Sequence, residues 1–557
     1  MTRKERVAFF VALAGAAASF VVVMNIVYAN ATKAVPAPGG EYAEGVVGQP
    51  EYVNPVIASS EADLDLVKLV YSDVDDVADS ITVSTDTRTW TVHLKSGLTW
   101  QDGEKLTSDD VVFTVQSIQD PDSHSPLAPS WQGVAVTRMS ELEVQFTLVN
   151  PYAFFASNLR DLYIVPKHLF ADTPVANWRL SDYDLKPVGS GPYRFASYAK
   201  DASGFISSYN LEAWDGNATQ ALIDRFDFNF FKNENDLVAA FNNGQVDGFA
   251  EASPADVTQI ERPYDSFAWP TSAYYAVFFN LSKNLALQDP DVRAALSMAV
   301  NRDTLVHDAL QGNGVPAFAP IPPGAPYFTA VAATTSLDLA SSTLADDGWQ
   351  IAGGSTTTVA DASSSAGGAA AVPAGFRFKM VHGATIPLTV NLTVPQIDFL
   401  ATTASELQAA WQSIGVQVNI LPDAPSDIVN QSVKNRDYEA LLFGNVLGPN
   451  SDLYSFWDSA RRFYPGLNLA IYASKGVDTA IEDARQSVST TVIAADMAAA
   501  QTRIASDTPA VFLYSPDYVY VTNRNVQGIA PSSTLFDPSD RFEEVPQWYL
   551  NTARILK

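Results

Sequence analysis

LKSGLTWQDGEKLTSDDVVFT, residues 94–114, predicts a strand, a tight turn and a capped helix within one short segment. The apolar side of the strand is supplied by Leu94, Leu98 and Trp100. The Asp-Gly dipeptide at residues 102–103 marks the turn, because glycine adopts a positive φ without a steric penalty. By itself this pattern predicts a stable structural unit and no particular function.

The second half of the same segment predicts the start of a helix. Thr107 is suited to cap its first turn, and Asp110 follows three residues later as a shorter form of the capping-box acid. The valines that come next are expected to form the buried face of the helix: Val111, Val112 and Val115.

Composition narrows the possible functions. A chain of 557 residues is too long for one hydrophobic core, so two or three lobes are expected. The formal net charge of −28 argues against nucleic acid or acidic lipid as a partner. Cysteine is absent, which excludes disulfides, thiolate catalysis, cysteine-bound metals and a lipid attached through cysteine.

The N-terminus predicts export from the cytoplasm. Three basic residues precede an apolar run at residues 7–29, which is long enough to span about 30 Å of hydrocarbon. Residues 29–31, Ala-Asn-Ala, also have the form that a signal peptidase cleaves. We expect residues 1–31 to be a membrane anchor or a signal peptide, with residues 7–29 as the tether to the cytoplasmic membrane. Either interpretation places the rest in the periplasm or at the cell surface, after a linker at residues 32–40.

Other motifs occur in a fixed order along the chain. They read VADSITVSTDTRTWTVHL (77–94), KPVGSGPY (186–193), FKNENDLVAAFNNGQVD (231–247), FFNLSKNLALQDPDVRAALSMAVNRDTLV (278–306), ASELQAAWQSIGVQVNI (404–420) and GPNSDLYSFWDSARR (448–462). With the segment at 94–114 they resemble the signatures of the extracytoplasmic solute-binding proteins of family 5, the peptide-binding components of ABC importers. The resemblance covers about residues 45–528 and departs from the family near residues 73–77, where a strand and a turn are almost missing.

This resemblance implies an α/β, periplasmic-binding-protein-like fold of type II, with two hinged lobes in a Venus-flytrap architecture and an extra third domain. Lobe I would be discontinuous, at residues 41–70, 185–270 and 508–557. The additional domain packed on it would cover residues 71–184. Lobe II would cover residues 271–507, with a low-complexity insertion at residues 353–375.

The resemblance also implies a site between the lobes, where a peptide pairs with strand edges and its ammonium meets a carboxylate. The family's acid matches Asp452, although Leu453 replaces the proline that usually follows. Asp452 could equally cap a helix at residues 453–459. Gly444 and Asn445 lie on the segment whose family counterpart runs along the ligand backbone, and Asn445 could instead make a turn.

Aromatic side chains on segments that should border the cleft are candidates for its walls. An aromatic at such a position belongs more often to the core than to a cleft wall. The candidates are Tyr274, Tyr275, Trp411, Phe443, Tyr454 and Trp457.

The sequence gives little support for catalysis. Its five histidines are scattered without a metal-binding pair, and no nucleophile elbow occurs. A carboxylate pair for glycoside hydrolysis stays open, because such partners meet only in the fold. We predict a protein that is not an enzyme and needs no cofactor or metal.

The resemblance implies a monomer that captures peptides and delivers them to ABC permease subunits served by cytoplasmic ATPases. There are two alternatives, the first on the same scaffold and the second of a different functional class. In one, the solute is an oligosaccharide or a metal chelate, and replacing Asp452 should then matter little. In the other, the chain is a membrane-tethered sensory or chaperone-like binding protein without a transport partner.

Overall fold

The computed structural model describes residues 2–216, 220–250, 257–353, 372–531 and 533–556. The side chains of residues 5, 7, 8, 11 and 29 lie outside this description, as does most of the insertion predicted at residues 353–375.

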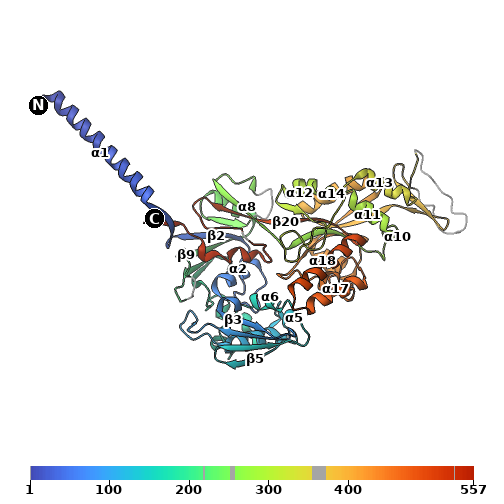
Figure 1. Ribbon diagram of the computed structural model, residues 1–557, viewed down its shortest axis with the longest axis horizontal. Coiled ribbons are helices and arrows are strands. Elements are labelled where there is room, and N and C mark those ends of the chain that lie inside the picture. Colours follow the sequence, from blue (N-terminus) through green and yellow to red (C-terminus); the bar gives the residue numbers. More distant parts are fainter. Residues whose placement is uncertain (1, 217–219, 251–256, 354–371, 532, 557) are drawn as a thin grey trace.

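A sheet of twelve strands runs through the body of the molecule (Figure 1). We call one part the first half-sheet: β2 (Glu41–Val47), β7 (Tyr193–Lys200), β8 (Ile206–Ala213), β9 (Arg225–Phe231), β10 (Gly248–Ala250) and β11 (Tyr264–Pro270). The other part is the second half-sheet: β12 (Ala273–Phe279), β13 (Gly314–Pro316), β17 (Thr389–Pro395), β18 (Gln417–Asp423) and β19 (Ala440–Val446). The long strand β20 (Ala510–Asn523) pairs with strands of both parts.

The chain crosses between the half-sheets twice, and the two crossings lie side by side. β20 pairs with β12 up to Tyr514 and with β11 from Asp517 onward. At this point the Ser515 hydroxyl donates to the carbonyl oxygens of Thr271, at 3.2 Å, and Ala273, at 2.7 Å. One side chain therefore ties the β20 crossing to the turn that joins β11 to β12.

β12 shows why the second half-sheet is buried on both faces. Val277 and Phe279 pack in a core with the helices α11 (Pro290–Met298), α12 (Arg302–Leu310), α13 (Leu337–Asp346) and α14 (Asp398–Ser413). Tyr274 and Phe278 pack instead with α17 (Lys475–Gln486) and α18 (Thr490–Asp507). Because successive side chains of a strand point to opposite faces, an unbroken apolar run suits a strand covered on both sides.

A separate four-stranded sheet forms what we call the small domain. Its strands are β3 (Ala78–Val83), β4 (Thr89–Leu94), β6 (Glu143–Thr147) and β5 (Ala135–Ser140), and its helices are α4 (Ser108–Gln119), α5 (Ala128–Trp131), α6 (Phe155–Arg160) and α7 (Lys167–Phe170). It shares a hydrophobic core with the first half-sheet and with α2 (Glu61–Val70).

Within the small domain, the helix start predicted at Thr107 is confirmed. Thr107 caps α4, and Asp110 completes the capping box. Val111 and Val115 are fully buried, whereas Val112 is only partly buried. The predicted strand is wrong beyond Leu94, where β4 ends, because the chain then turns back through an isolated bridge between Thr99 and Lys105.

The segment at residues 94–114 and the motif at residues 186–193 meet at the end of α2. Gln101 donates from its side-chain amide to the Tyr193 carbonyl oxygen, at 2.7 Å, and accepts from the Gly189 N–H at 2.9 Å. The Gly191 N–H donates to the Val70 carbonyl oxygen at 2.8 Å. The bend at residues 186–193 is therefore a packing element and not a phosphate cradle.

The remaining elements are shorter or lie at the periphery. They are α3 (Val74–Val77), α8 (Glu234–Asn242), α10 (Leu285–Gln288), α15 (Pro425–Asp427), α16 (Tyr454–Trp457) and the three-stranded sheet of β14 (Gln350–Ile351), β15 (Arg377–Val381) and β16 (Ala384–Pro387).

The C-terminal strand pairs with the segment that follows the N-terminal helix. The helix α1 (Arg3–Ala31) projects away from the body, and β1 (Thr32–Ala37), within the predicted linker, pairs with the C-terminal strand β21 (Asn551–Leu556) (Figure 1). Among the described residues, no helix combines the length and the apolar character needed to cross a bilayer.

Candidate ligand-binding cavity

A cavity of 460 Å³ lies between the small domain, the end of β19, the stretch at residues 55–68 that includes most of α2, and the segment at residues 536–540. Its walls come from five stretches of the chain, most of them far apart in sequence. The lining residues are Pro55, Ala58, Ser59, Leu64, Val67 and Lys68; Pro126, Leu127, Asp161 and Tyr163; Val446, Leu447, Gly448 and Pro449; and Phe536, Asp537, Ser539 and Asp540.

The wall from the second half-sheet follows directly from the end of β19. The Leu447 N–H donates to the Ser272 carbonyl oxygen at 3.2 Å, and the Ser272 hydroxyl donates back to the Leu447 carbonyl oxygen at 2.7 Å. The Ser272 N–H also donates to the Leu535 carbonyl oxygen, at 3.0 Å, beside the opposite wall. The crossing turn between β11 and β12 therefore holds both walls of the cavity.

The ionisable groups of the cavity are mostly acidic. Lys68 pairs with Asp540, whose carboxylate oxygen lies 3.2 Å from the Lys68 Nζ. The Asp161 carboxylate has no hydrogen-bond or ion-pair partner among the described residues. Burial and the nearby Asp540 carboxylate raise the pKa of Asp161 to about 6. Asp161 thus offers a carboxylate without a direct partner on an exposed residue, near the charged groups of Asp540 and Lys68.

Asp452 lies next to this region but does not line the cavity. Its carboxylate is 3.1 Å from the Arg485 Nε, and it accepts from the Tyr152 hydroxyl at 3.3 Å. It also accepts from the N–H of Tyr454, the first residue of α16, at 3.0 Å. The cap residue of α16 is Leu453, and no side chain caps this helix, which covers only part of the helix predicted at residues 453–459. Burial raises the pKa of Asp452, and the Arg485 guanidinium opposes this increase.

Three of the predicted site residues form one buried network. The Tyr274 hydroxyl accepts from the Asn445 side-chain amide at 2.8 Å and from the Trp457 indole N–H at 3.1 Å. Gly444 lies beside them, and a Cβ at this position would come within 2.8 Å of the Tyr275 ring. The segment at residues 443–446 is thus fitted closely against β12, and its contact with ligand stays a prediction.

The other predicted aromatics occupy different places. Trp411 is fully buried in α14 and donates to the Leu296 carbonyl oxygen at 2.9 Å. Tyr275 packs against Phe399, and Tyr454 lies under the Arg485 guanidinium. Phe443 is partly buried beside the Tyr274 core.

In the described part of the chain, none of the nine predicted residues lines the cavity. Residues 446–449 could have been found, because they directly follow the segment that the resemblance placed along the ligand. Asp161 carried no local signal, since an isolated aspartate after a short helix is common on surfaces.

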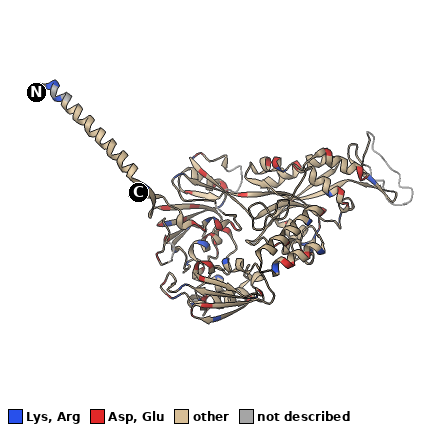
Figure 2. Ribbon diagram, in the orientation of Figure 1, with Lys and Arg blue, Asp and Glu red and all other residues tan. Residues whose placement is uncertain are grey.

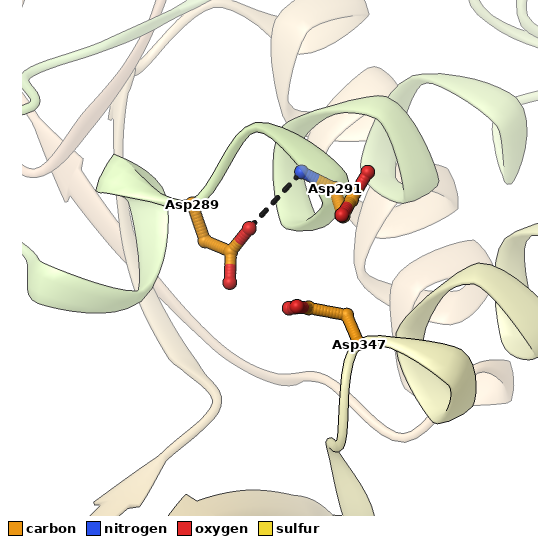
Figure 3. A group of neighbouring side chains, drawn as sticks. All are labelled: Asp289, Asp291 and Asp347. Atoms are coloured by element: carbon orange, nitrogen blue, oxygen red, sulfur yellow. Dashed lines mark hydrogen bonds between the residues drawn. The ribbon is translucent and has the colours of Figure 1, made fainter. Parts of the chain in front are cut away.

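A separate group of acids lies far from the cavity, at the start of α11. Ligand oxygens of Asp289, Asp291 and Asp347 lie within 4.8 Å of one another (Figure 3). The Lys379 ammonium bonds to Asp289 at 3.1 Å and to Asp347 at 2.7 Å, and Asp289 caps the helix. A lysine and a helix end therefore account for this cluster without a metal ion.

The family model for bacterial extracellular solute-binding proteins, family 5, matches residues 74–463. The chain belongs to this family. As a family 5 binding protein it is extracytoplasmic and is a substrate-binding protein rather than an enzyme, as the sequence predicted.

Known proteins agree with this assignment over nearly the full length. The family 5 binding protein is 23% identical to the oligopeptide-binding protein AppA of Bacillus subtilis, over 92% of each chain. Its fold matches the ABC transporter substrate-binding protein CtaP of Listeria monocytogenes with a TM-score of 0.75 and 24% identity, covering 92% of this chain and 99% of that one. NikZ of Campylobacter jejuni, solved with Ni(L-His), matches the fold with a TM-score of 0.68 and 20% identity, covering 91% of this chain and 99% of that one. The type II periplasmic-binding-protein fold is therefore confirmed.

Proposed function

We propose that this protein binds peptides in the cavity between the half-sheets and delivers them to an ABC permease that works with cytoplasmic ATPases. The observation that carries the proposal is the 460 Å³ cavity, whose walls come from residues 55–68, the small domain, the end of β19 with residues 447–449, and residues 536–540. Its size falls within the range of about 300–1,000 Å³ that is usual for small-molecule sites. The name of the related AppA supports a peptide as the solute.

The position of the cavity fits a protein that encloses its ligand by hinge bending. Both crossings between the half-sheets pass through Ser272 and Ser515, next to the cavity walls. We propose that two bodies move about these crossings. The first consists of lobe I, at residues 41–70, 185–270 and 508–557, together with the additional domain at residues 71–184. The second is lobe II, at residues 271–507. Closure would then bring residues 446–449 over a ligand held by the opposite wall.

Native mass spectrometry of protein purified from cells tests the peptide proposal. We expect the protein to retain a mixture of peptides, which denaturation releases and tandem mass spectrometry identifies. Retention of a single non-peptide metabolite, together with no binding of any peptide from a library of two to ten residues, would contradict it.

A metal chelate is the second candidate solute, because the fold also matches NikZ, a protein solved with Ni(L-His). Competition separates the two candidates. A bound chelate should be displaced by other nickel chelates and leave the peptide library unbound, whereas bound peptides should be displaced by peptides alone.

We also propose that residues 7–29 tether the protein to the cytoplasmic membrane, supported by their apolar sequence and by the basic residues before them. Fractionation of cells tests this point. The protein should sediment with membranes and resist extraction by high salt, and its intact mass should include residues 1–31. A soluble form that begins at residue 32 would show cleavage instead.

A further inference from the structure

The cavity offers one acid that the structure leaves available for a ligand. Asp540 is already paired with Lys68, and its other carboxylate oxygen accepts from the N–H groups of Phe536, at 3.1 Å, and Asp537, at 3.0 Å. Asp537 accepts from the N–H and the hydroxyl of Ser539, at 2.9 and 2.6 Å. Asp161 alone among the three has no such partner within the described residues.

Asp452, in contrast, is already neutralised. Arg485 lies against its carboxylate and also stacks over the rings of Tyr152 and Tyr454, at 5.0 and 4.1 Å from their centroids. A ligand ammonium at Asp452 would have to displace a guanidinium that is held by two aromatic rings and a carboxylate. Such a displacement leaves a buried charge without its partner, which is unfavourable.

The remaining lining sets the kind of ligand that fits. Apolar residues from α2, the small domain and the end of β19 line the cavity, among them Leu64, Leu127 and Val446. The charged lining residues are one lysine and three aspartates, so the wall favours a cation. A volume of 460 Å³ lies in the lower half of the usual range for small-molecule sites, which favours a short ligand over an extended oligopeptide.

We propose that the cavity takes a solute the size of a di- or tripeptide, and that the Asp161 carboxylate binds its protonated amine. This inference rests on the proposed peptide-binding function and specifies its ligand class. The apolar walls would take the side chains, and Asp161 would replace Asp452 as the acid that receives the positive end.

Equilibrium dialysis with mass-spectrometric detection tests the proposal on the full chain in detergent. The probes are a mixture of random di- and tripeptides and the same mixture with acetylated N-termini. We expect the free peptides to be retained. The affinity for the acetylated peptides should be lower by at least about tenfold, because acetylation removes the ammonium. The variant Asp161→Asn should lower the affinity for free peptides by a similar factor.

Asp172→Asn is the matched control, because it removes the same charge from an exposed position of the small domain outside the cavity lining. It should bind free peptides as the native protein does. Equal retention of free and acetylated peptides, or a larger loss with Asp452→Asn than with Asp161→Asn, would overturn the inference and leave the proposed function standing. Retention of longer peptides only would also overturn the inference and leave the proposed function standing. Failure to retain any peptide would overturn the inference and the proposed function together.

The pH dependence of binding gives a second readout. Asp161 faces Asp540 and Asp537, which favour its protonation, and Lys68 and Arg160, which oppose it. Affinity for free peptides should therefore fall as the pH drops below about 6, where the Asp161 carboxylate takes up a proton. In Asp161→Asn this fall should be absent, and an unchanged pH profile in the variant would count against the proposal.

Discussion

Arg541 joins three distant segments of the chain through buried ion pairs. Its guanidinium donates to both carboxylate oxygens of Asp65 on α2, at 2.8 and 2.6 Å, and to Glu44 on β2 at 3.1 Å. All three side chains are almost completely buried. A residue near the C-terminus therefore fixes the first half-sheet against α2, beside the cavity.

Replacing Arg541 with leucine should destabilise the protein strongly, because Asp65 and Glu44 would lose their buried partner. We expect a loss of about 3–5 kcal/mol in the free energy of unfolding, measured by urea denaturation. The control is Arg524→Leu, whose ion pair with Asp265 is exposed and should change stability by less than about 0.5 kcal/mol. Equal effects of the two substitutions would contradict this account.

The same cluster predicts a pH dependence of stability. Burial raises the pKa of Asp65 to about 7, well above its ordinary value of about 4 in an unfolded chain. Between these values the folded state binds the proton more tightly, so the contribution of Asp65 to stability increases as the pH falls from 8 to 5. Relative to Asp65→Asn, the native protein should thus gain stability over this interval in urea titrations. A difference that stays constant with pH would refute the prediction.

At the scale of elements, the bend at residues 186–193 depends on two glycines that pack on the end of α2. A Cβ on Gly189 would lie 1.9 Å from the Val70 carbonyl oxygen, and one on Gly191 would lie 2.7 Å from the carbonyl carbon of the same residue. Neither position requires a positive φ. The need for glycine is therefore a matter of space against the backbone of another element.

Gly189→Ala should accordingly cost about 1–3 kcal/mol or more in the free energy of unfolding, because the backbone of α2 has little freedom to move. Gly476→Ala is the matched control: a Cβ there meets nothing within 4 Å, and the residue lies in the first turn of α17. That variant should be neutral or slightly more stable, as followed by thermal unfolding. A neutral Gly189→Ala would mean that α2 and the bend separate easily.

Elements with a strong local signal were predictable from the sequence. The capping box at Thr107 follows from the spacing of Thr107 and Asp110 within one helical turn. The partners of Gln101 could not be predicted, because its amide bonds to a motif about ninety residues away. The two glycines of that motif are explained by their close packing against the end of α2, which the sequence alone does not reveal.

At the scale of the whole molecule, the small domain contacts the second half-sheet as well as the first. The Ala153 N–H donates to the Arg485 carbonyl oxygen at 2.7 Å, and Phe154 is buried in the core that holds α17 and α18. α6 lies beside α17 in Figure 1. This contact ties the small domain to the helices that cover the second half-sheet.

Phe154→Ala should weaken this contact and shift the protein toward a more open arrangement. We expect a larger radius of gyration in small-angle X-ray scattering, and recovery of the native value when ligand is added, since ligand favours the closed form. The control is Phe463→Ala, whose exposed ring lies on the surface of the second lobe and whose loss should leave the scattering unchanged. An unchanged radius in Phe154→Ala would show that the crossings alone hold the lobes together.

Charge is also distributed over the whole molecule, with acidic side chains on most elements of the body (Figure 2). The net charge of −28 therefore reflects a general surface property that favours solubility, and does not locate the site. The site needed the specific pairing of each carboxylate, which composition does not contain.

The amino-acid sequence alone determined the family, because its motifs consist of residues that are near neighbours in the chain, and it predicts an export signal at residues 1–31 for the same reason. The tertiary structure decided which acid is free to meet a ligand. Arg485 reaches Asp452 and Lys68 reaches Asp540 across long separations in sequence, whereas Asp161 is left unpaired within the described residues. Pairing of charges between such separated residues depends on how each lobe folds, and no local pattern encodes it.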